Sequence, residues 1–361
     1  MKLLWEPIDD AKVRLNVYNF RTVAPERSFA VNSNPELLTG YAAAQNPFKG
    51  GDVNEIPVST DTGKTYFGSV DLHTDWTNIQ LLGSYQHIST IRALDFDGTT
   101  LPIAEFDALD DGAYNKPVFS TNRSAELRFV SNEHASDWIT FVSGVYLFDQ
   151  DSGFGGAKFV AGGSNLAQGT LAGITIPGLQ STYNNLLAST PGLSALLPAR
   201  VASLGVRGVL NDKSIAGYTQ VTLKPFEWGS ITLGGRYTYD KKCIKYADQL
   251  LYVNSTTQVP LFHYDACGQA LSGAVVNDSH DSKYRTETKN FDPKVSLNFR
   301  PGDGWLGTHP LLYVSYQTAS IGDTYNIISL LNAPDRAVGS KITAYEAGFK
   351  TTLFDGLMSL D

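Results

Sequence analysis

The connections between the predicted strands alternate in length, and this alternation constrains the fold more than any other feature of the sequence. We predict twelve strands in six pairs, each pair joined by a short turn. The pairs are residues 2–7 with 11–20, 65–74 with 78–90, 124–131 with 137–149, 214–225 with 230–240, 290–300 with 311–319, and a terminal hairpin around the turn at 354–356. Long polar connections separate the pairs, at residues 21–64, 91–123, 150–213, 241–289 and 320–342.

Connections of this length are unusual in a compact soluble domain, where the median is about 4–6 residues. Strict alternation of tight turns and long loops is typical of an outer-membrane β-barrel, whose periplasmic turns are short and whose extracellular loops are extended. We therefore predict an all-β fold, a partial antiparallel transmembrane β-barrel of about twelve strands that is open or incomplete.

The predicted strands have one apolar and one polar face. In residues 230–240, Ile231, Leu233 and Tyr237 alternate with polar side chains that include Thr232 and Arg236. Successive side chains of a strand point to opposite faces, so the two sets lie on opposite sides of the sheet. A Lys or Arg facing lipid at the bilayer midplane costs about 2–4 kcal/mol. The uncharged faces are therefore expected to contact lipid, and the polar faces an aqueous lumen.

The tryptophans gather beside the short turns. All five, Trp5, Trp76, Trp138, Trp228 and Trp305, lie in these turns or within a few residues of them. Trp prefers the membrane interface, where its ring is in an apolar environment and its N–H remains hydrated. We interpret these residues as candidates for a periplasmic membrane girdle; the alternative is that each covers a hairpin of a soluble protein.

Composition and motifs exclude several functions. The formal charge of −8 argues against a nucleic-acid partner, which requires a basic surface. We find no G-x-S-x-G, H-E-x-x-H or Walker motif, and the six histidines include no pair at i and i+4. We therefore predict that the protein is not an enzyme, and that it has no catalytic residues, no metal site and no cofactor.

Five strings in the predicted hairpins carry a resemblance to a known family. They are LLWEPIDDAKVRLNVY, SAELRFVS with DWITFVSGVYLFDQ, ITLGGRYTYDKK, FDPKVSLNFRP with LLYVSYQTA, and ITAYEAGFKTTLFDGLMSLD. In this order they resemble successive barrel hairpins of TonB-dependent outer-membrane receptors. The resemblance runs through the strands from the first residue to the last and is weak in the long loops.

The resemblance implies a bacterial outer-membrane location and uptake of a ligand such as a ferric siderophore. Members of the family have a 22-stranded barrel closed by an N-terminal plug domain. We expect residues 1–361 to be part of the barrel domain only, with the plug absent. Outer-membrane lipid and a small iron chelate are the implied partners, together with the TonB energy-coupling protein in the full-length receptor. A passive outer-membrane pore and a soluble β-rich binding or adhesion module are the alternatives, and the sequence does not identify the ligand.

Six cations are expected to face the lumen. They are Arg14, Arg128, Arg236, Lys294, Arg300 and Lys350, all on the polar faces of predicted strands. One interpretation is that they keep the lumen hydrated or pair with carboxylates of a plug. The other is that some of them attract an anionic ligand such as a ferric chelate. The sequence does not separate the two.

The only two cysteines, Cys243 and Cys267, fall in the long connection at residues 241–289. If this connection is extracellular, the pair lies in an oxidising compartment and can form a disulfide. Two free thiols in a cytosolic protein are the alternative.

Overall fold

The strands form one large antiparallel sheet. The computed structural model describes residues 1–25, 58–95, 104–108, 116–132, 134–161, 165–171, 174–175, 178–189, 203–252, 258–267, 277–302, 304, 307–327, 333–354 and 357–360. The main path of hydrogen-bonded strands runs β1-β2-β3-β4-β5-β7-β10-β11-β14-β15-β18-β19, and β6 pairs with both β4 and β7. β12 pairs with β11 and, in parallel, with β13, and two two-stranded sheets, β16-β17 and β8-β9, complete the topology of the described residues.

The strands that build the wall, apart from β1, are longer than the other elements. The wall consists of β1 (Lys2–Ile8), β2 (Ala11–Pro25), β3 (Val58–His73), β4 (Thr77–Asp95), β6 (Lys116–Ser131), β7 (Ile139–Ala161), β10 (Ser203–Phe226), β11 (Gly229–Tyr252), β14 (Arg285–Phe299), β15 (Thr308–Ile321) and β18 (Ser340–Leu353). The shorter elements are β5 (Ala104–Ala108), η1 (Leu166–Gln168), β8 (Thr170–Leu171), β9 (Ile174–Thr175), α1 (Leu179–Ser189), β12 (Gln258–Asp265), β13 (Asn277–His280), η2 (Ser282–Tyr284), β16 (Thr324–Asn326), β17 (Asp335–Ala337) and β19 (Met358–Leu360).

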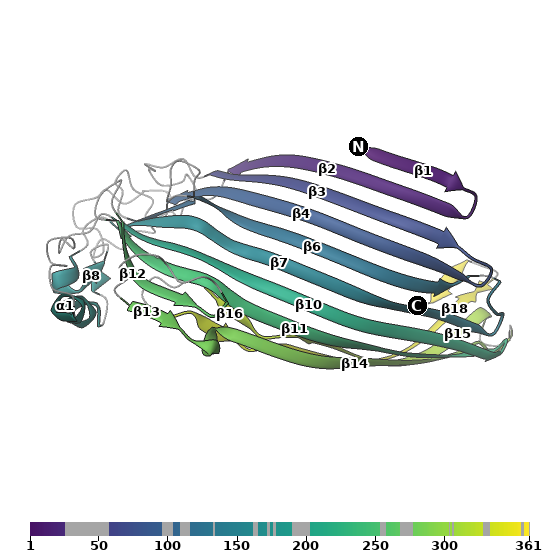
Figure 1. Ribbon diagram of the computed structural model, residues 1–361. Coiled ribbons are helices and arrows are strands. Elements are labelled where there is room, and N and C mark those ends of the chain that lie inside the picture. Colours follow the sequence, from purple (N-terminus) through teal and green to yellow (C-terminus); the bar gives the residue numbers. More distant parts are fainter. Residues whose placement is uncertain are drawn as a thin grey trace.

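The short turns lie together at one end of the wall and the longer connections at the other (Figure 1). The sheet also curls, so that the yellow β15 and β18 are seen behind β7 and β10 (Figure 1). The antiparallel all-β wall of a barrel, predicted from the alternating connections, is confirmed. Among the described residues, no helix has the length and apolar character needed to cross a membrane.

The boundaries of the strands were predicted too narrowly at the end that carries the long connections. β10 and β11 each contain 24 residues and stay paired from Phe226↔Gly229 to Ser203↔Tyr252. Their outer halves had been assigned to loops, because polar residues on both faces hide the period-two pattern. Backbone hydrogen bonding continues there although neither face is uniformly apolar. β5, β12, β13 and α1 also lie in ranges predicted as loops.

Apolar side chains are concentrated on the outer face rather than in one central core. Many large hydrophobic residues of the wall are exposed, including Leu81, Leu127, Val145, Leu147, Ile215, Ile231, Leu233, Phe291, Leu297, Leu312 and Val314. Two small buried clusters lie near the long connections. One contains Phe106, Ala108 and Val206, and the other is built on Ile244 and Tyr284. A wall with an exposed apolar face needs an apolar solvent against it, as a bilayer provides.

Candidate functional site: a polar pocket on the inner face

A large polar pocket lies on the inner face of the wall. It has a volume of about 1030 Å³ and is lined by residues of β6, β7, β10, β11, β14 and β15. Its charged lining residues are four acids, Glu126, Asp212, Asp240 and Asp292, and four bases, Arg128, Arg236, Lys242 and Lys294. The charges therefore balance, so the pocket offers both hydrogen-bond donors and acceptors. It has no net charge that would favour ions of one sign.

A three-residue cluster joins β6 to β10 in this pocket. Arg128 donates from Nη2 to both carboxylate oxygens of Glu126, at 2.9 and 3.0 Å, and from Nε to the Tyr218 hydroxyl at 3.2 Å. Tyr218 in turn donates its hydroxyl hydrogen to Glu126. Charge-assisted hydrogen bonds of this kind are about twice as strong as neutral ones. The cluster therefore holds the Arg128 guanidinium in a fixed orientation toward the pocket.

Gly144 of β7 makes this cluster possible. In the register of the sheet Gly144 pairs with Arg128 on one side and Tyr218 on the other. A Cβ at this position would lie 2.7 Å from the Tyr218 hydroxyl oxygen and 2.7 Å from the Leu127 carbonyl oxygen. The absence of a side chain therefore leaves room for the tyrosine to cross the strand.

The same register row continues through the neighbouring strands. Arg236 of β11 pairs with Tyr218 on one side and with Asp292 of β14 on the other. Its Nε donates to the Thr238 hydroxyl at 3.1 Å, and its guanidinium lies 5.5 Å from the ring centroid of Tyr146. A cation over an aromatic face is attracted to the ring quadrupole. Arg236 is thereby held flat against the wall.

Asp292 is held by hydroxyl donors. Thr318 and Ser320 of β15 donate to its Oδ1 at 3.0 and 2.8 Å. The pocket thus presents carboxylate and guanidinium groups that are already hydrogen-bonded. Such preorganised groups can contact a polar solute and release it again. Sequence reasoning singled out Arg128 and Arg236 but not Glu126, Tyr218 or Asp292, although Glu126 stands two residues before Arg128 and so shares its face.

The other predicted lumen cations are distributed along the wall. Arg14 of β2 forms an ion pair with Asp71 of β3 at 2.5 Å. Lys294 lines the main pocket, whereas Arg300 lines a second pocket of about 510 Å³ beside the short turns. Lys350 lies in β18, opposite Leu311 in the register. The structure brings Arg128, Arg236 and Lys294 into one pocket and leaves the other three apart from it.

Four of the five tryptophans lie among the described residues. Trp5 is in β1, and Trp76, Trp138 and Trp228 are in or next to the short turns at the same end of the wall. All four are exposed, and Trp228 stacks on Phe226 with ring centroids 4.7 Å apart. Trp305 lies outside the described residues. A membrane girdle at this end stays a prediction.

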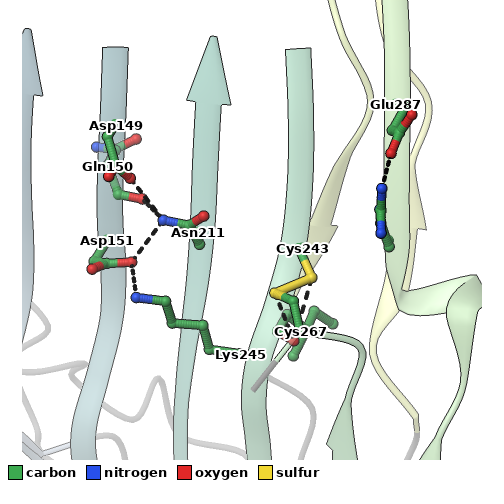
Figure 2. Close-up of a disulfide and its surroundings, with 10 residues drawn as sticks. Asp149, Gln150, Asp151, Asn211, Cys243, Lys245, Cys267 and Glu287 are labelled. Carbon is green, nitrogen blue, oxygen red and sulfur yellow. Dashed lines mark hydrogen bonds and ion pairs between the residues drawn. A yellow bond between two sulfur atoms is a disulfide. The ribbon is translucent and has the colours of Figure 1, made fainter. Parts of the chain in front are cut away.

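The two cysteines form a disulfide at the opposite end of the wall (Figure 2). Cys243 was predicted to lie in a loop, but it lies inside β11 and is buried. Cys267 follows β12, and its backbone N–H donates to the Ile244 carbonyl at 3.3 Å. The bond therefore ties the end of the β12 excursion back to the strand from which it started.

The connection after β15 folds back against the wall and is fixed by Asp323. The Asp323 carboxylate accepts from the Gly339 backbone N–H at 2.6 Å and pairs with Arg336. The Gly339 N–H and the Arg336 guanidinium lower the pKa of Asp323, and Asp323 raises the pKa of Arg336. Tyr325 donates to the Lys283 carbonyl at 2.7 Å. This segment lines a pocket of about 470 Å³ with side chains of β4, β6 and β7.

A buried charged network lies in the extensions of β10 and β11. The Asp248 carboxylate accepts from Arg207 Nε and lies against His263 Nδ1, both at 2.5 Å. His263 Nε2 is 3.1 Å from Asp265. His263 and Asp248 are almost completely buried. Nothing in the spacing of these residues along the sequence pointed to the network, because it depends on the pairing of β11 with β12. Among the described residues, no group of His, Cys, Asp or Glu side chains is arranged to hold a metal ion.

The wall shares its fold with solved uptake receptors. The ferric yersiniabactin uptake receptor FyuA from Yersinia pestis superposes with a TM-score of 0.62 at 13% identity, over 97% of this chain and 42% of that one. The siderophore receptor PiuA from Acinetobacter baumannii gives 0.51 at 12% identity, over 96% and 46%. The chain thus spans less than half the length of either receptor. No family model matches the sequence, and no curated protein matches it.

Proposed function

We propose that the chain is part of the barrel domain of a TonB-dependent receptor in the bacterial outer membrane, and that this receptor takes up a ferric siderophore. One observation carries the proposal: the wall is apolar outside and lined inside by a charge-balanced pocket, in a fold that FyuA matches over 97% of the chain. An apolar exterior around a polar interior suits a protein that conducts a hydrophilic solute through lipid.

The inner wall serves passage rather than chemistry. A solute that moves along the lumen exchanges its water hydrogen bonds for those of Arg236, Asp292 and the Arg128 cluster, and then returns to water. Because these groups are already paired, none of them binds the solute tightly enough to trap it. Directional uptake then requires energy, which the TonB energy-coupling protein supplies in the complete receptor. We propose no bond-making step and no enzymatic activity.

The ligand class rests on two considerations. FyuA is described as a ferric yersiniabactin uptake receptor and PiuA as a siderophore receptor. A metal chelate of this kind exposes carbonyl, hydroxyl and carboxylate groups, and the pocket on this wall can donate to them and accept from them. The balance of four acids and four bases favours a chelate of small net charge over a strongly anionic one.

The proposal can be tested by uptake of ⁵⁵Fe-labelled siderophores in iron-starved cells of the native host. We expect deletion of the gene to abolish accumulation of at least one siderophore, and a protonophore to abolish the same accumulation in the parent strain. Entry that survives the protonophore would instead support a passive pore. Recovery of the protein in the aqueous phase after detergent partitioning would support a soluble binding module.

Variants of the pocket sharpen the test. Arg236→Gln removes a cation from the pocket, and Lys12→Gln removes one near the short turns, where Lys12 lies 3.5 Å from Glu6. The first variant should slow uptake of the siderophore while the second leaves it unchanged, at equal amounts of protein in the outer membrane. Equal rates for both variants would show that the pocket is not on the path.

A further inference from the structure

The outer face of the wall changes character sharply at one row of the sheet register. The row runs Tyr85–Arg123–Asp149–Lys213–Lys241–Glu287, with one residue from each of β4, β6, β7, β10, β11 and β14. Two residues nearer the short turns, the outer face carries Ala125, Leu147, Ile215 and Tyr239. The apolar band therefore ends where the charged row begins.

The charged row is loosely paired. Arg123 Nη1 and Lys213 Nζ both lie 3.9 Å from the same Oδ2 of Asp149, and their side chains are 53% and 59% exposed. One carboxylate thus faces two cations, neither within ordinary hydrogen-bond distance. Lys241 continues the row beside Glu287, which also pairs with Arg285. The row keeps an excess of positive charge that its own carboxylates do not neutralise.

The adjacent positions add further cations on the same face. Lys245 of β11 reaches across β10 to Asp151 of β7, with Nζ 2.7 Å from Oδ1 (Figure 2). Lys289 is exposed, and its Nζ lies 5.9 Å from the ring centroid of Tyr239. We call the set Arg123, Lys213, Lys241, Lys245, Arg285 and Lys289 the basic belt. Its six cations face three carboxylates, those of Asp149, Asp151 and Glu287.

We infer that the basic belt binds the phosphate groups of a glycolipid in the outer leaflet of the membrane. The occupant follows from position and charge: acyl chains against the apolar band place the headgroup at the next rows of the sheet, which are those of the belt. Lys and Arg at a membrane surface each contribute about 1 kcal/mol toward anionic headgroups. Arg also contacts phosphate through two parallel hydrogen bonds. Phosphate, rather than a neutral sugar, matches the unneutralised cations.

The inference concerns the outside of the wall and is independent of any transported ligand. It can therefore be tested on the purified full chain in detergent micelles, with diphosphoryl lipid A as the probe and native mass spectrometry or fluorescence as the readout. The test variant carries Arg123→Gln, Lys213→Gln and Lys241→Gln. The control variant carries Lys12→Gln, Lys224→Gln and Arg300→Gln, which remove the same charge near the short turns.

We expect the test variant to bind lipid A about 100-fold more weakly than the wild type, from three cations at the membrane surface. The control variant should bind as the wild type does, and added salt should weaken wild-type binding. Asp149→Asn provides an independent check that removes no cation. It leaves Arg123 and Lys213 without their shared carboxylate, so binding of lipid A should tighten about 5-fold.

Two results would overturn the inference. One is binding to the dephosphorylated glycolipid as tight as binding to the diphosphoryl form, which would assign the site to the acyl chains or sugars. The other is equal affinity of the wild type, the test variant and Asp149→Asn for lipid A. If the test variant does not fold, Asp149→Asn decides the matter alone: tighter binding supports the belt, and unchanged binding refutes it.

Discussion

Tyr218 of β10 donates its hydroxyl hydrogen bond to Glu126 of β6, across the intervening strand β7. The two strands are not neighbours in the sheet. A side chain can make this contact only where the middle strand carries no side chain on the inner face, and Gly144 is that position. The inner wall is thus cross-linked by side chains in addition to the backbone ladder.

Replacing Tyr218 by Phe is expected to destabilise the wall modestly. The substitution keeps the ring over Gly144 and removes the bonds to Glu126 and Arg128, and a bond to a charged group contributes about 1.5–3 kcal/mol. Because the pocket is open to water, we expect a loss below this range, about 1 kcal/mol. Urea unfolding followed by intrinsic fluorescence would measure it. Tyr237→Phe on the exposed outer face is the control and should change stability by much less.

The two faces of the wall can be tested at adjacent residues. Val314 of β15 is exposed on the outer face, and Ser315 pairs in the register with Glu346 on the inner face. Val314→Arg places a charge in lipid and should destabilise the assembled barrel by about 2–4 kcal/mol. Ser315→Arg places its charge beside the Glu346 carboxylate and should leave assembly unchanged. Heat-modifiable mobility on a gel reports assembly.

Not every residue of a polar face can serve as the control, and Thr232 of β11 is an example of one that cannot. Thr232 is buried, and its hydroxyl lies 2.8 Å from that of Thr222, so an arginine there would disturb packing as well as charge. If Val314→Arg and Ser315→Arg reduced assembly equally, the assignment of the two faces would be wrong.

Removal of the disulfide should affect the extension of β11 rather than the whole wall. Cys243 and Cys267 are 24 residues apart, and closing a loop of that length contributes roughly 3 kcal/mol in the chain-entropy model. In the double variant Cys243→Ala with Cys267→Ala, limited proteolysis should cut within residues 244–266 much faster. Residues 215–240 should stay protected from the protease. In a separate free-thiol assay, two reactive thiols in the denatured, unreduced wild type would contradict the disulfide.

Acid should release the segment that follows β15. The pKa of Asp323 is lowered by the Gly339 N–H and Arg336, so the ionised carboxylate stabilises the folded segment. This contribution is complete at neutral pH and is lost as the pH falls through the lowered pKa. Hydrogen exchange of the Gly339 amide, corrected for its intrinsic rate, should accelerate in that range. Asp323→Asn should exchange faster at neutral pH and lose most of the acid dependence.

The sequence was informative wherever one face of a strand is apolar. The alternation of Ile231 and Leu233 with polar residues located β11, and the position of Arg236 on its polar face followed directly. It was uninformative in residues 241–252, because apolar and polar side chains occur on both faces there and no period-two pattern marks the strand, although Ile244 and Asp248 are buried. Contacts across strands, such as those of Tyr218 with Glu126 or His263 with Asp248, depend on the register in which the strands pair. This register cannot be read from the spacing of residues along the sequence.

In the proposed outer-membrane receptor, the length of β10 and β11 determines what can be reached from outside the cell. A strand of 24 residues spans about 80 Å along its own axis, and tilted by about 45° it rises about 55 Å. The hydrocarbon layer accounts for about 30 Å of that height. The remaining outer ends of β10 and β11, up to the tip at Ser203 and Tyr252, stand clear of the lipid, paired with β7 on one side and with β12 on the other. An antibody raised against this tip would therefore label intact cells, whereas one against the segment around Leu233 would require the membrane to be dissolved first.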